Sequence, residues 1–185
     1  MMTKIVGLSG SLRRGSLNTL LLRAAARLMP DVTFELADIS GVPLYNGDVE
    51  AEQGIPASVV RLKDLVAGSD GLLIATPEYN QSTPGVLKNA IDWMTRPADD
   101  ISRVFLKKPV AVIGASPGRF GTARSQSVLL PVLHALRVRA FFDAPPFYLS
   151  AAHKAFDAEG QLIDAAQRDR LTDFLREFIA FATGK

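Results

Sequence analysis

Short apolar runs alternate along this chain with longer segments in which apolar residues recur every three or four positions. The short runs predict strands, and the longer segments predict helices with one buried face. The predicted strands cover residues 4–8, 32–39, 71–75, 109–114 and 138–142. The predicted helices cover residues 17–28, 57–67, 84–94 and 164–183, and a further helix after residue 122 carries Leu129, Val132, Leu133 and Leu136. Strands that alternate with helices favour an α/β fold, in which a parallel sheet carries helices on both faces.

Residues 32–39 alternate between apolar and polar side chains, which is typical of a strand with one exposed face. This strand is therefore expected at an edge of the sheet. Residues 40–56 are rich in glycine, proline, asparagine and acidic residues, which predicts a long loop. A second loop is expected from Arg96 to the strand at residue 109. The chain of 185 residues has no convincing linker, so residues 1–185 are expected to form a single domain.

The loop after the first strand, Ser9–Thr19, concentrates glycine, hydroxyl and basic residues directly before a helix. The free N–H groups and the positive end of a helix favour an anion at such a place. The loop is therefore predicted to hold a phosphate group. It lacks both the lysine of a Walker A loop and the G-x-G-x-x-G of a dinucleotide-binding turn. The alternative interpretation is that Ser16 only caps the helix and that Arg13 and Arg14 are solvated.

Two further loops with polar or glycine-rich composition follow predicted strands, at residues 76–83 and 115–122. In parallel α/β sheets, ligands bind beyond the carboxyl ends of the strands, where the strand order reverses. Three such loops, one of them a phosphate loop after the first strand, favour a flavodoxin-like three-layer sandwich with a five-stranded sheet of order 2-1-3-4-5. FMN is the usual ligand of that arrangement.

Several motifs in these loops resemble those of the NADPH-dependent FMN reductases, a family that includes bacterial chromate and quinone reductases. The matching segments span most of the chain in the family's order: Gly10–Arg13 with Ser16 and Asn18, Val42–Asn46, Thr76–Asn80, Pro84–Trp93, and Gly114–Ser116 with Gly118, Gly121 and Arg124. The resemblance implies an FMN enzyme that passes hydride from NADPH or NADH through the flavin to an acceptor. Quinones, azo compounds, chromate and free flavin are the acceptor classes that it implies.

The resemblance also implies which residues bind the cofactor. The residues implied to hold the FMN phosphate are Ser11, Arg13, Ser16, Asn18 and Thr19, and Ser9 offers a further hydroxyl in the same loop. The residues implied to line the isoalloxazine ring, largely through backbone groups, are Pro77, Glu78, Tyr79, Asn80 and Ser82 on one side and Ser116, Gly118, Arg119 and Gly121 on the other. Thr122 departs from the family pattern, which often has a glycine there, and its side chain could narrow the loop. Ser127 and Pro146 also differ from close relatives, near subunit contacts.

No catalytic side chain is assigned, because a flavin supplies the reactive chemistry itself. His134 lies in a predicted helix and is interpreted as structural, whereas His153 lies in a loop and is interpreted as solvated. Tyr79 is interpreted as a neighbour of the ring rather than a surface aromatic, and Trp93 as a core or dimer residue. Arg119 has two open interpretations, namely contact with the flavin or the incoming nucleotide's phosphate, and simple solvation.

Gly114–Gly118 also matches the G-x-S-x-G pattern of a hydrolase nucleophile elbow. That site uses the backbone N–H of the residue after the serine, and here this residue is Pro117, which has none. Loss of one oxyanion donor costs about 10²–10³ in turnover, which disfavours a hydrolase. The remaining alternative is a flavodoxin-like electron carrier or FMN-binding regulator without its own turnover. Such carriers are usually strongly acidic to steer their partners, whereas this chain has a net charge of +2.

The composition excludes several other classes. The chain has no cysteine, which excludes disulfides, thiolate metal sites and a cysteine nucleophile, and no metal site is predicted. The small net charge, without a basic stripe, argues against nucleic acid as a partner. No apolar run approaches the ~20 residues of a membrane span, and the N-terminus lacks the pattern of a signal peptide. A cytoplasmic protein without a membrane partner is expected, assembled as a homodimer or homotetramer.

Overall fold

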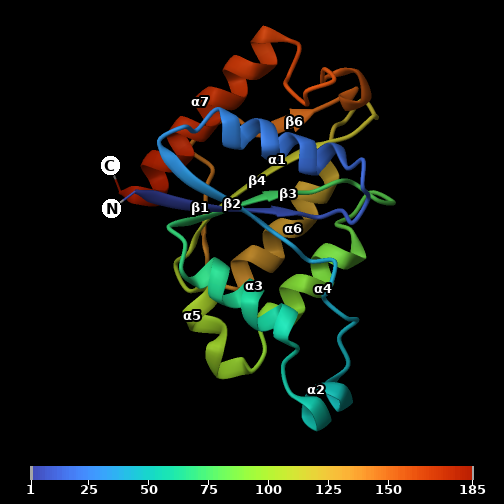
Figure 1. Ribbon diagram of the computed structural model, residues 1–185, viewed down its shortest axis with the longest axis vertical. Coiled ribbons are helices and arrows are strands. Elements are labelled where there is room, and N and C mark those ends of the chain that lie inside the picture. The colour runs from blue at the N-terminus through green and yellow to red at the C-terminus, as the bar shows by residue number, and fades with distance from the viewer. Residues whose placement is uncertain (1, 185) are drawn as a thin grey trace.

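The computed structural model describes residues 2–184 and has three layers, with the sheet between two layers of helices (Figure 1). The strands are β1 (Thr3–Ser9), β2 (Val32–Ala37), β3 (Gly71–Ala75), β4 (Pro109–Ala115), β5 (Arg139–Ala140) and β6 (Phe147–Leu149). The helices are α1 (Leu17–Arg27), α2 (Gly47–Gln53), α3 (Ala57–Ala67), α4 (Gly85–Met94), α5 (Ile101–Phe105), α6 (Ala123–Ala135) and α7 (Ala165–Thr183). Two 3₁₀ turns, η1 (Ala98–Asp100) and η2 (Ala152–Lys154), complete the regular structure.

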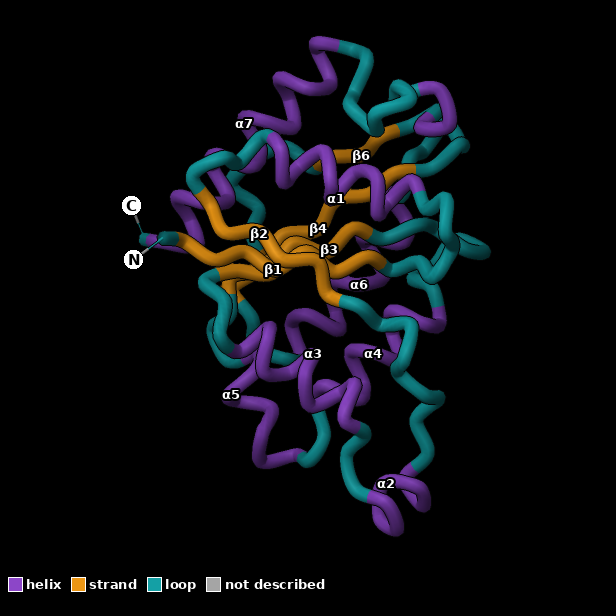
Figure 2. Tube along the Cα trace, viewed as in Figure 1, coloured by secondary structure: helices purple, strands orange, loops and turns teal. Residues whose placement is uncertain are grey.

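All of the strands are parallel, and the main path through the sheet runs β2-β1-β3-β4-β5, so the predicted order is confirmed. β2 lies at one edge, as its alternating pattern predicts, and the orange strands in Figure 2 form one layer between the purple helices. Successive side chains of a strand point to opposite faces. In β1, Ile5 therefore joins the core under α1 and α7, whereas Val6 and Leu8 join the core over α3 to α6. Burial on both faces explains the continuous apolar runs of the central strands.

Two segments predicted as loops contain helices. Residues 40–56 include α2, which has no buried residue and projects from the rest of the molecule (Figure 1). The Asn46 side chain caps α2 by accepting the Asp48 N–H at 2.9 Å, and the Glu50 carboxylate binds the Arg96 guanidinium at 2.8 Å. Because no face of α2 is buried, the segment has no apolar period from which a helix could be predicted. The second segment, after Arg96, contains η1 and α5.

The predicted fifth strand, residues 138–142, is interrupted. Only Arg139 and Ala140 pair with β4, after which the chain leaves the sheet and returns as β6, a sixth strand, which pairs with Ile113–Ala115 of β4. The Phe141 ring instead packs against Phe174 of α7, with ring centroids 5.2 Å apart. Pro145 and Pro146, which lack a backbone N–H, precede β6 and cannot donate to a ladder. The apolar character of Phe141 therefore reflects packing outside the sheet, whereas Phe142 is 64% exposed.

A buried lysine connects α3 to the segment after α4. Lys63 is 3% exposed, and its ammonium group binds the Asp100 carboxylate and donates to the Arg96 carbonyl oxygen. Arg103 Nε also donates to Asp100 Oδ1, at 2.6 Å. Hydrogen bonds from Arg103 and Lys63 hold the pKa of Asp100 well below its usual range. The ionised carboxylate of Asp100 is thus favoured in the folded chain.

Acidification is expected to weaken this cluster. Since the folded pKa of Asp100 is lowered, its contribution to stability is complete above the unfolded value of about 3.9 and is lost as the pH falls through the folded value. Melting temperatures measured from pH 6 to pH 2 should therefore fall below about pH 4. The variant Asp100→Asn should have a lower melting temperature than the wild type at pH 6, and its melting temperature should fall less between pH 6 and pH 2. An equal fall in both proteins would show that Asp100 does not cause the loss of stability.

Candidate functional site

The loop between β1 and α1 is shaped by hydrogen bonds within it. The Ser16 side chain caps α1 by accepting the Thr19 N–H at 3.2 Å, and Ser11 Oγ accepts the Arg13 N–H at 3.3 Å. No acidic residue lies in the first turn of α1, so no carboxylate there offsets the positive end of the helix. Arg13 is exposed beside this end. The loop therefore presents an uncompensated positive end, a basic side chain and hydroxyl groups at one place.

Two of the predicted phosphate ligands, Asn18 and Thr19, use their side chains to hold this loop together. Asn18 is 2% exposed, and its amide group donates to the Ala115 carbonyl oxygen and accepts the Ala115 N–H, both at 2.9 Å. Thr19 Oγ1 donates to Ser9 Oγ at 2.9 Å. The Asn18 amide thereby joins the start of α1 to the carboxyl end of β4. This contact places the β1–α1 loop beside the β4–α6 loop.

The β3–α4 loop forms a tight turn at its tip. Tyr79 and Ser82 exchange two backbone hydrogen bonds of 3.1 and 3.0 Å, and the residues between them, Asn80 and Gln81, have φ angles of 51° and 64°. Positive φ at both central residues is the pattern of a type I′ turn. Asparagine tolerates this conformation better than glutamine does. The turn leaves the Tyr79 side chain 45% exposed.

The β4–α6 loop closes the other side of the site. Ser116 Oγ accepts the Gly118 N–H at 3.0 Å, and Gly121 has a φ of 56°. A Cβ atom at Gly121 would lie 2.8 Å from Tyr148 Cβ, so this position requires glycine for both conformation and space. Phe120 is 64% exposed, and the Arg124 guanidinium lies 4.9 Å from the centre of its ring.

Thr122, which departs from the family pattern, points inward. Its side chain is fully buried, and its hydroxyl accepts a hydrogen bond of 3.0 Å from Gln126 Nε2. A Cβ atom built on Gly114 of β4 would lie only 1.8 Å from Thr122 Oγ1. The threonine therefore fills space between α6 and β4, and its side chain does not narrow the groove between the loops.

These three loops enclose a shallow groove at the carboxyl ends of β1, β3 and β4. Eight of the predicted site residues line it: Ser11, Arg13, Ser16, Asn18, Pro77, Glu78, Tyr79 and Ser116. The groove is also lined by Leu17, Ala115 and Pro117, which were not predicted to bind the cofactor. The predicted site residues outside its lining are Ser9, Thr19, Asn80, Ser82, Gly118, Arg119 and Gly121. The enclosed volume is about 70 Å³, well below the ~300–1,000 Å³ of deep ligand pockets, so a nucleotide bound here would remain partly exposed.

The hydrolase interpretation gains no support from the geometry of Ser116. Its Oγ accepts the Gly118 N–H, and within residues 2–184 it has no hydrogen bond to a histidine. His134 lies in α6 and is exposed, whereas His153 lies in η2 rather than in an irregular loop.

Trp93 is fully buried in α4, and its Nε1 donates to the Pro43 carbonyl oxygen at 2.8 Å. Trp93 is thus a core residue.

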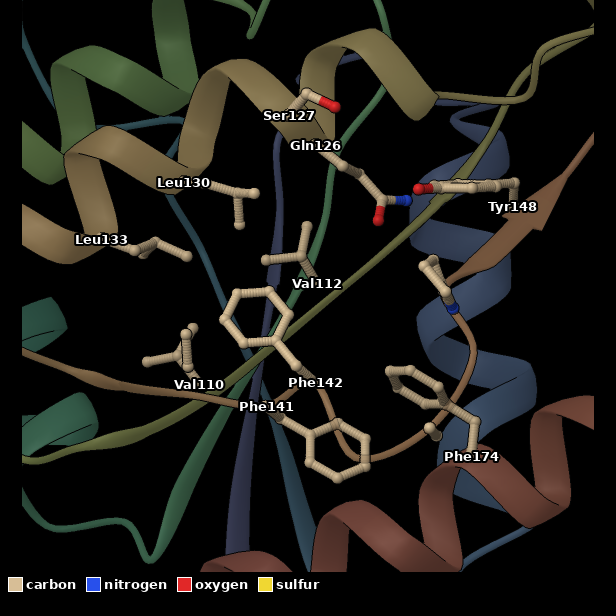
Figure 3. Close-up of a pocket in the computed structure, with 13 residues that line it drawn as sticks. Val110, Val112, Gln126, Ser127, Leu130, Leu133, Phe141, Phe142, Tyr148 and Phe174 are labelled. Carbon is tan, nitrogen blue, oxygen red and sulfur yellow. The ribbon is translucent and has the colours of Figure 1, made fainter.

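A larger apolar cavity lies elsewhere, beside the interrupted edge of the sheet (Figure 3). It has a volume of about 220 Å³ and lies between α6, β4 and the segment that joins β5 to β6. Phe141, Phe142 and Phe174 contribute their rings, and Gln126 and Tyr148 contribute polar groups (Figure 3). None of the predicted site residues lines this cavity. The groove and the cavity are therefore separate features of the molecule.

The described residues contain no group of three or more histidine, cysteine, aspartate or glutamate residues that could hold a metal ion. No helix within residues 2–184 combines the length and the apolar character needed to cross a membrane.

Comparison with known proteins identifies the family. The model of the NADPH-dependent FMN reductases matches residues 3–154. An NAD(P)H-dependent FMN reductase of Pseudomonas aeruginosa is 48% identical, over 94% of this chain and 91% of its own length. A 2-hydroxy-1,4-benzoquinone reductase of Burkholderia is 41% identical, over 98% of this chain and 97% of its own length. The structure of the flavoenzyme NAD(P)H:(acceptor) oxidoreductase FerB of Paracoccus denitrificans superposes with a TM-score of 0.88 at 36% identity and covers 98% of both chains. As its motifs indicate, the chain belongs to the NADPH-dependent FMN reductase family, whose members are oxidoreductases with FMN as cofactor and NAD(P)H as electron donor.

Proposed function

We propose that this chain is an NAD(P)H:quinone reductase that binds FMN in the groove between the β1–α1, β3–α4 and β4–α6 loops. The observation that carries the proposal is the convergence of these loops at the switch point of the sheet, where flavodoxin-like folds bind FMN. Relatives named as quinone reductases in Burkholderia and Escherichia coli, 41% and 37% identical, support a quinone as the acceptor. Azo compounds, chromate and free flavin are the alternative acceptors.

The residues of the groove suit a flavin nucleotide. The phosphate would be held by Arg13, by the hydroxyls of Ser11 and Ser16, and by the N–H groups at the start of α1. Asn18 and Thr19 would act by keeping this loop in place, through their bonds to Ala115 and Ser9. Among the described residues, Ser11 and Ser16 only accept N–H groups of the loop, so their O–H groups are free to donate to the phosphate. The ring would be lined on one side by the backbone of Pro77–Asn80 and Ser82, with Tyr79 as its aromatic neighbour.

The opposite side of the ring would be formed by Ser116, Gly118, Arg119 and Gly121. Gly118 and Arg119 are exposed at the tip of the β4–α6 loop, where Arg119 could meet the phosphate of an incoming nicotinamide nucleotide. When bound, FMN supplies the capacity to accept and pass on hydride. The protein contributes orientation, positive charge and partial exclusion of water, and no side chain is assigned a proton-transfer step.

Steady-state oxidation of NADPH and NADH with a benzoquinone acceptor tests this function. Sustained turnover that depends on FMN is expected. A protein that binds FMN but does not turn over would instead support the electron carrier or regulator. A comparison of benzoquinone, an azo dye, chromate and free FMN at equal concentration would rank the acceptors, and a kcat/KM higher for any other acceptor than for benzoquinone would contradict the quinone assignment.

Substitution of Ser116 distinguishes the reductase from the hydrolase. The variant Ser116→Ala should retain at least about a third of the wild-type kcat, because the Ser116 hydroxyl forms no covalent bond in the reductase reaction. It loses only the acceptor for the Gly118 N–H. Reductase activity and hydrolysis of a p-nitrophenyl ester should be measured together. Ester hydrolysis by the wild type that disappears in the variant would favour the hydrolase. Complete loss of reductase activity with FMN still bound would contradict the claim that the Ser116 hydroxyl takes no part in the reaction.

We further propose that the protein is cytoplasmic, where reduced nicotinamide nucleotides are available, and that it forms a homodimer or homotetramer. Leu44 is 83% and Phe142 64% exposed, and an interface between copies of the chain would cover such side chains. Light scattering after size-exclusion chromatography gives the oligomeric state directly, and a monomer at micromolar concentration would contradict this assignment.

A further inference from the structure

The carboxylate of Glu78 caps a helix from outside its own chain segment. Glu78 Oε2 accepts the Arg124 N–H at 3.0 Å and the Ser125 N–H at 3.4 Å, both in the first turn of α6. The first N–H groups of a helix have no partner within it. The residue at the usual capping position, Thr122, makes no side-chain capping bond, because its hydroxyl instead accepts from Gln126. Glu78 therefore takes the place of a local cap.

Two threonines of the same loop bind Ser125 as well. The hydroxyl groups of Thr76 and Ser125 are hydrogen-bonded at 2.9 Å, and Thr83 Oγ1 donates to the Ser125 carbonyl oxygen at 3.1 Å. Ser125 is completely buried. Its N–H, hydroxyl and carbonyl groups thus all bind residues of the β3–α4 loop. The β3–α4 loop is therefore attached to α6 at three points, namely Thr76 at its beginning, Glu78, and Thr83 at its end.

The strained turn of the loop lies between these attachment points. Asn80 and Gln81 hold positive φ angles within the Tyr79–Ser82 turn. Non-glycine residues persist in this conformation where the surrounding structure restrains them. Glu78 immediately precedes this turn, so its hydrogen bonds to α6 hold the backbone at the start of the turn in place.

We propose that Glu78 is a positioning residue, whose carboxylate sets the β3–α4 loop against the β4–α6 loop through the first turn of α6. This inference rests on the proposed function, since these loops are the two walls of the flavin groove. Glu78 lines the groove, and its side chain fixes the relative position of the walls. Phosphate binding by the β1–α1 loop does not depend on this contact.

The test compares two variants that each remove a carboxylate cap. Glu78→Ala removes the cap of α6, and Asp164→Ala removes the cap of α7, where Asp164 Oδ1 accepts the Gln167 N–H at 3.1 Å away from the groove. Each should lower the melting temperature by roughly 2–4 °C, as loss of a cap typically does in a chain of this size. Only Glu78→Ala should lower kcat/KM for benzoquinone, by about 10–100-fold, since small misplacements of reacting groups cost this much.

Spectroscopy separates positioning from stability. Glu78→Ala should alter the visible circular dichroism of the bound flavin, and its loss of kcat/KM should persist at FMN concentrations that saturate the variant, because the phosphate ligands remain. Glu78→Gln keeps an oxygen that accepts the Arg124 N–H, so it should restore most of kcat/KM and the wild-type spectrum. If Glu78→Ala does not fold, Glu78→Asp, whose side chain is one methylene shorter and draws the carboxylate away from the Arg124 and Ser125 N–H groups, should shift the same signals in the same direction.

A Glu78→Ala protein with wild-type kcat/KM and flavin spectrum would overturn the proposal, as would a Glu78→Gln protein that behaves like Glu78→Ala. Unchanged signals in Glu78→Asp would overturn it where that variant is needed. A wild-type protein that fails to bind FMN or reduce benzoquinone would refute the proposed function instead. The two failures are distinguishable, because the wild type is measured in each assay.

Discussion

Replacement of Gly114 by alanine should destabilise the protein by about 3 kcal/mol, at the upper end of the usual cost of overpacking a core. A Cβ atom at this position would lie 1.8 Å from Thr122 Oγ1 and 2.6 Å from the Thr76 carbonyl oxygen. The first neighbour belongs to a side chain, but the second belongs to the backbone at the carboxyl end of β3. To relieve both contacts, β3 and α6 must each move away from β4. This movement would occur at the carboxyl ends of the strands, where the groove lies. The melting temperature should fall by roughly 6–12 °C, and FMN should bind more weakly.

A double variant tests this explanation. Gly114→Ala combined with Thr122→Gly removes the hydroxyl contact but leaves the carbonyl contact, so it should recover part of the lost stability. Gly85→Ala is the matched control, because a Cβ at Gly85 has no atom within 4 Å. It should leave stability unchanged or raise it slightly, since Gly85 begins α4. A fall in melting temperature for Gly114→Ala no larger than that for Gly85→Ala would contradict the packing argument.

Replacement of Arg13 by alanine should raise the dissociation constant for FMN by about 10–100-fold, the usual worth of a hydrogen bond to a charged group. Arg13 lines the groove beside the positive end of α1, which no acidic residue offsets and where the phosphate is proposed to bind. Titration of the apoprotein with FMN measures this effect. The difference between variant and wild type should narrow at high salt, because the arginine is exposed.

Two controls make the Arg13 prediction specific. Arg14→Ala removes the neighbouring exposed arginine, which does not line the groove, and should change FMN affinity by less than about threefold. Riboflavin lacks the phosphate, so its affinity should be the same for Arg13→Ala and the wild type. Equal FMN affinity in Arg13→Ala and wild type, or an equal loss for riboflavin, would show that Arg13 does not bind the phosphate.

The predictability of each element follows from where its side chains are buried. β3 could be predicted because Gly71–Ala75 is buried on both faces, which requires an uninterrupted apolar run. α2 could not, because none of its residues is buried and it is held by polar contacts such as that of Glu50 with Arg96. The break within the predicted strand 138–142 could not be predicted either. Phe141 would be apolar whether it packed in a sheet or, as it does, against Phe174 of α7.

The same limit applies to the site. The composition of Ser9–Thr19 predicts an anion loop because the required groups are adjacent in sequence. The bond of Asn18 to Ala115, 97 residues away, could not be predicted, and neither could that of Glu78 to Arg124, 46 residues away. A local pattern shows that a side chain is polar, but not which distant group it will meet.

The visible absorption spectrum of the purified protein, recorded before and after addition of NADPH without oxygen, tests the central claim most directly. A flavin band that bleaches on addition of NADPH is the predicted result, because it requires both bound FMN and transfer of hydride to it. Protein purified without the cofactor should show the same behaviour after one equivalent of FMN is added. A colourless protein that takes up no FMN, or a bound flavin that NADPH and NADH both fail to bleach, would contradict the account.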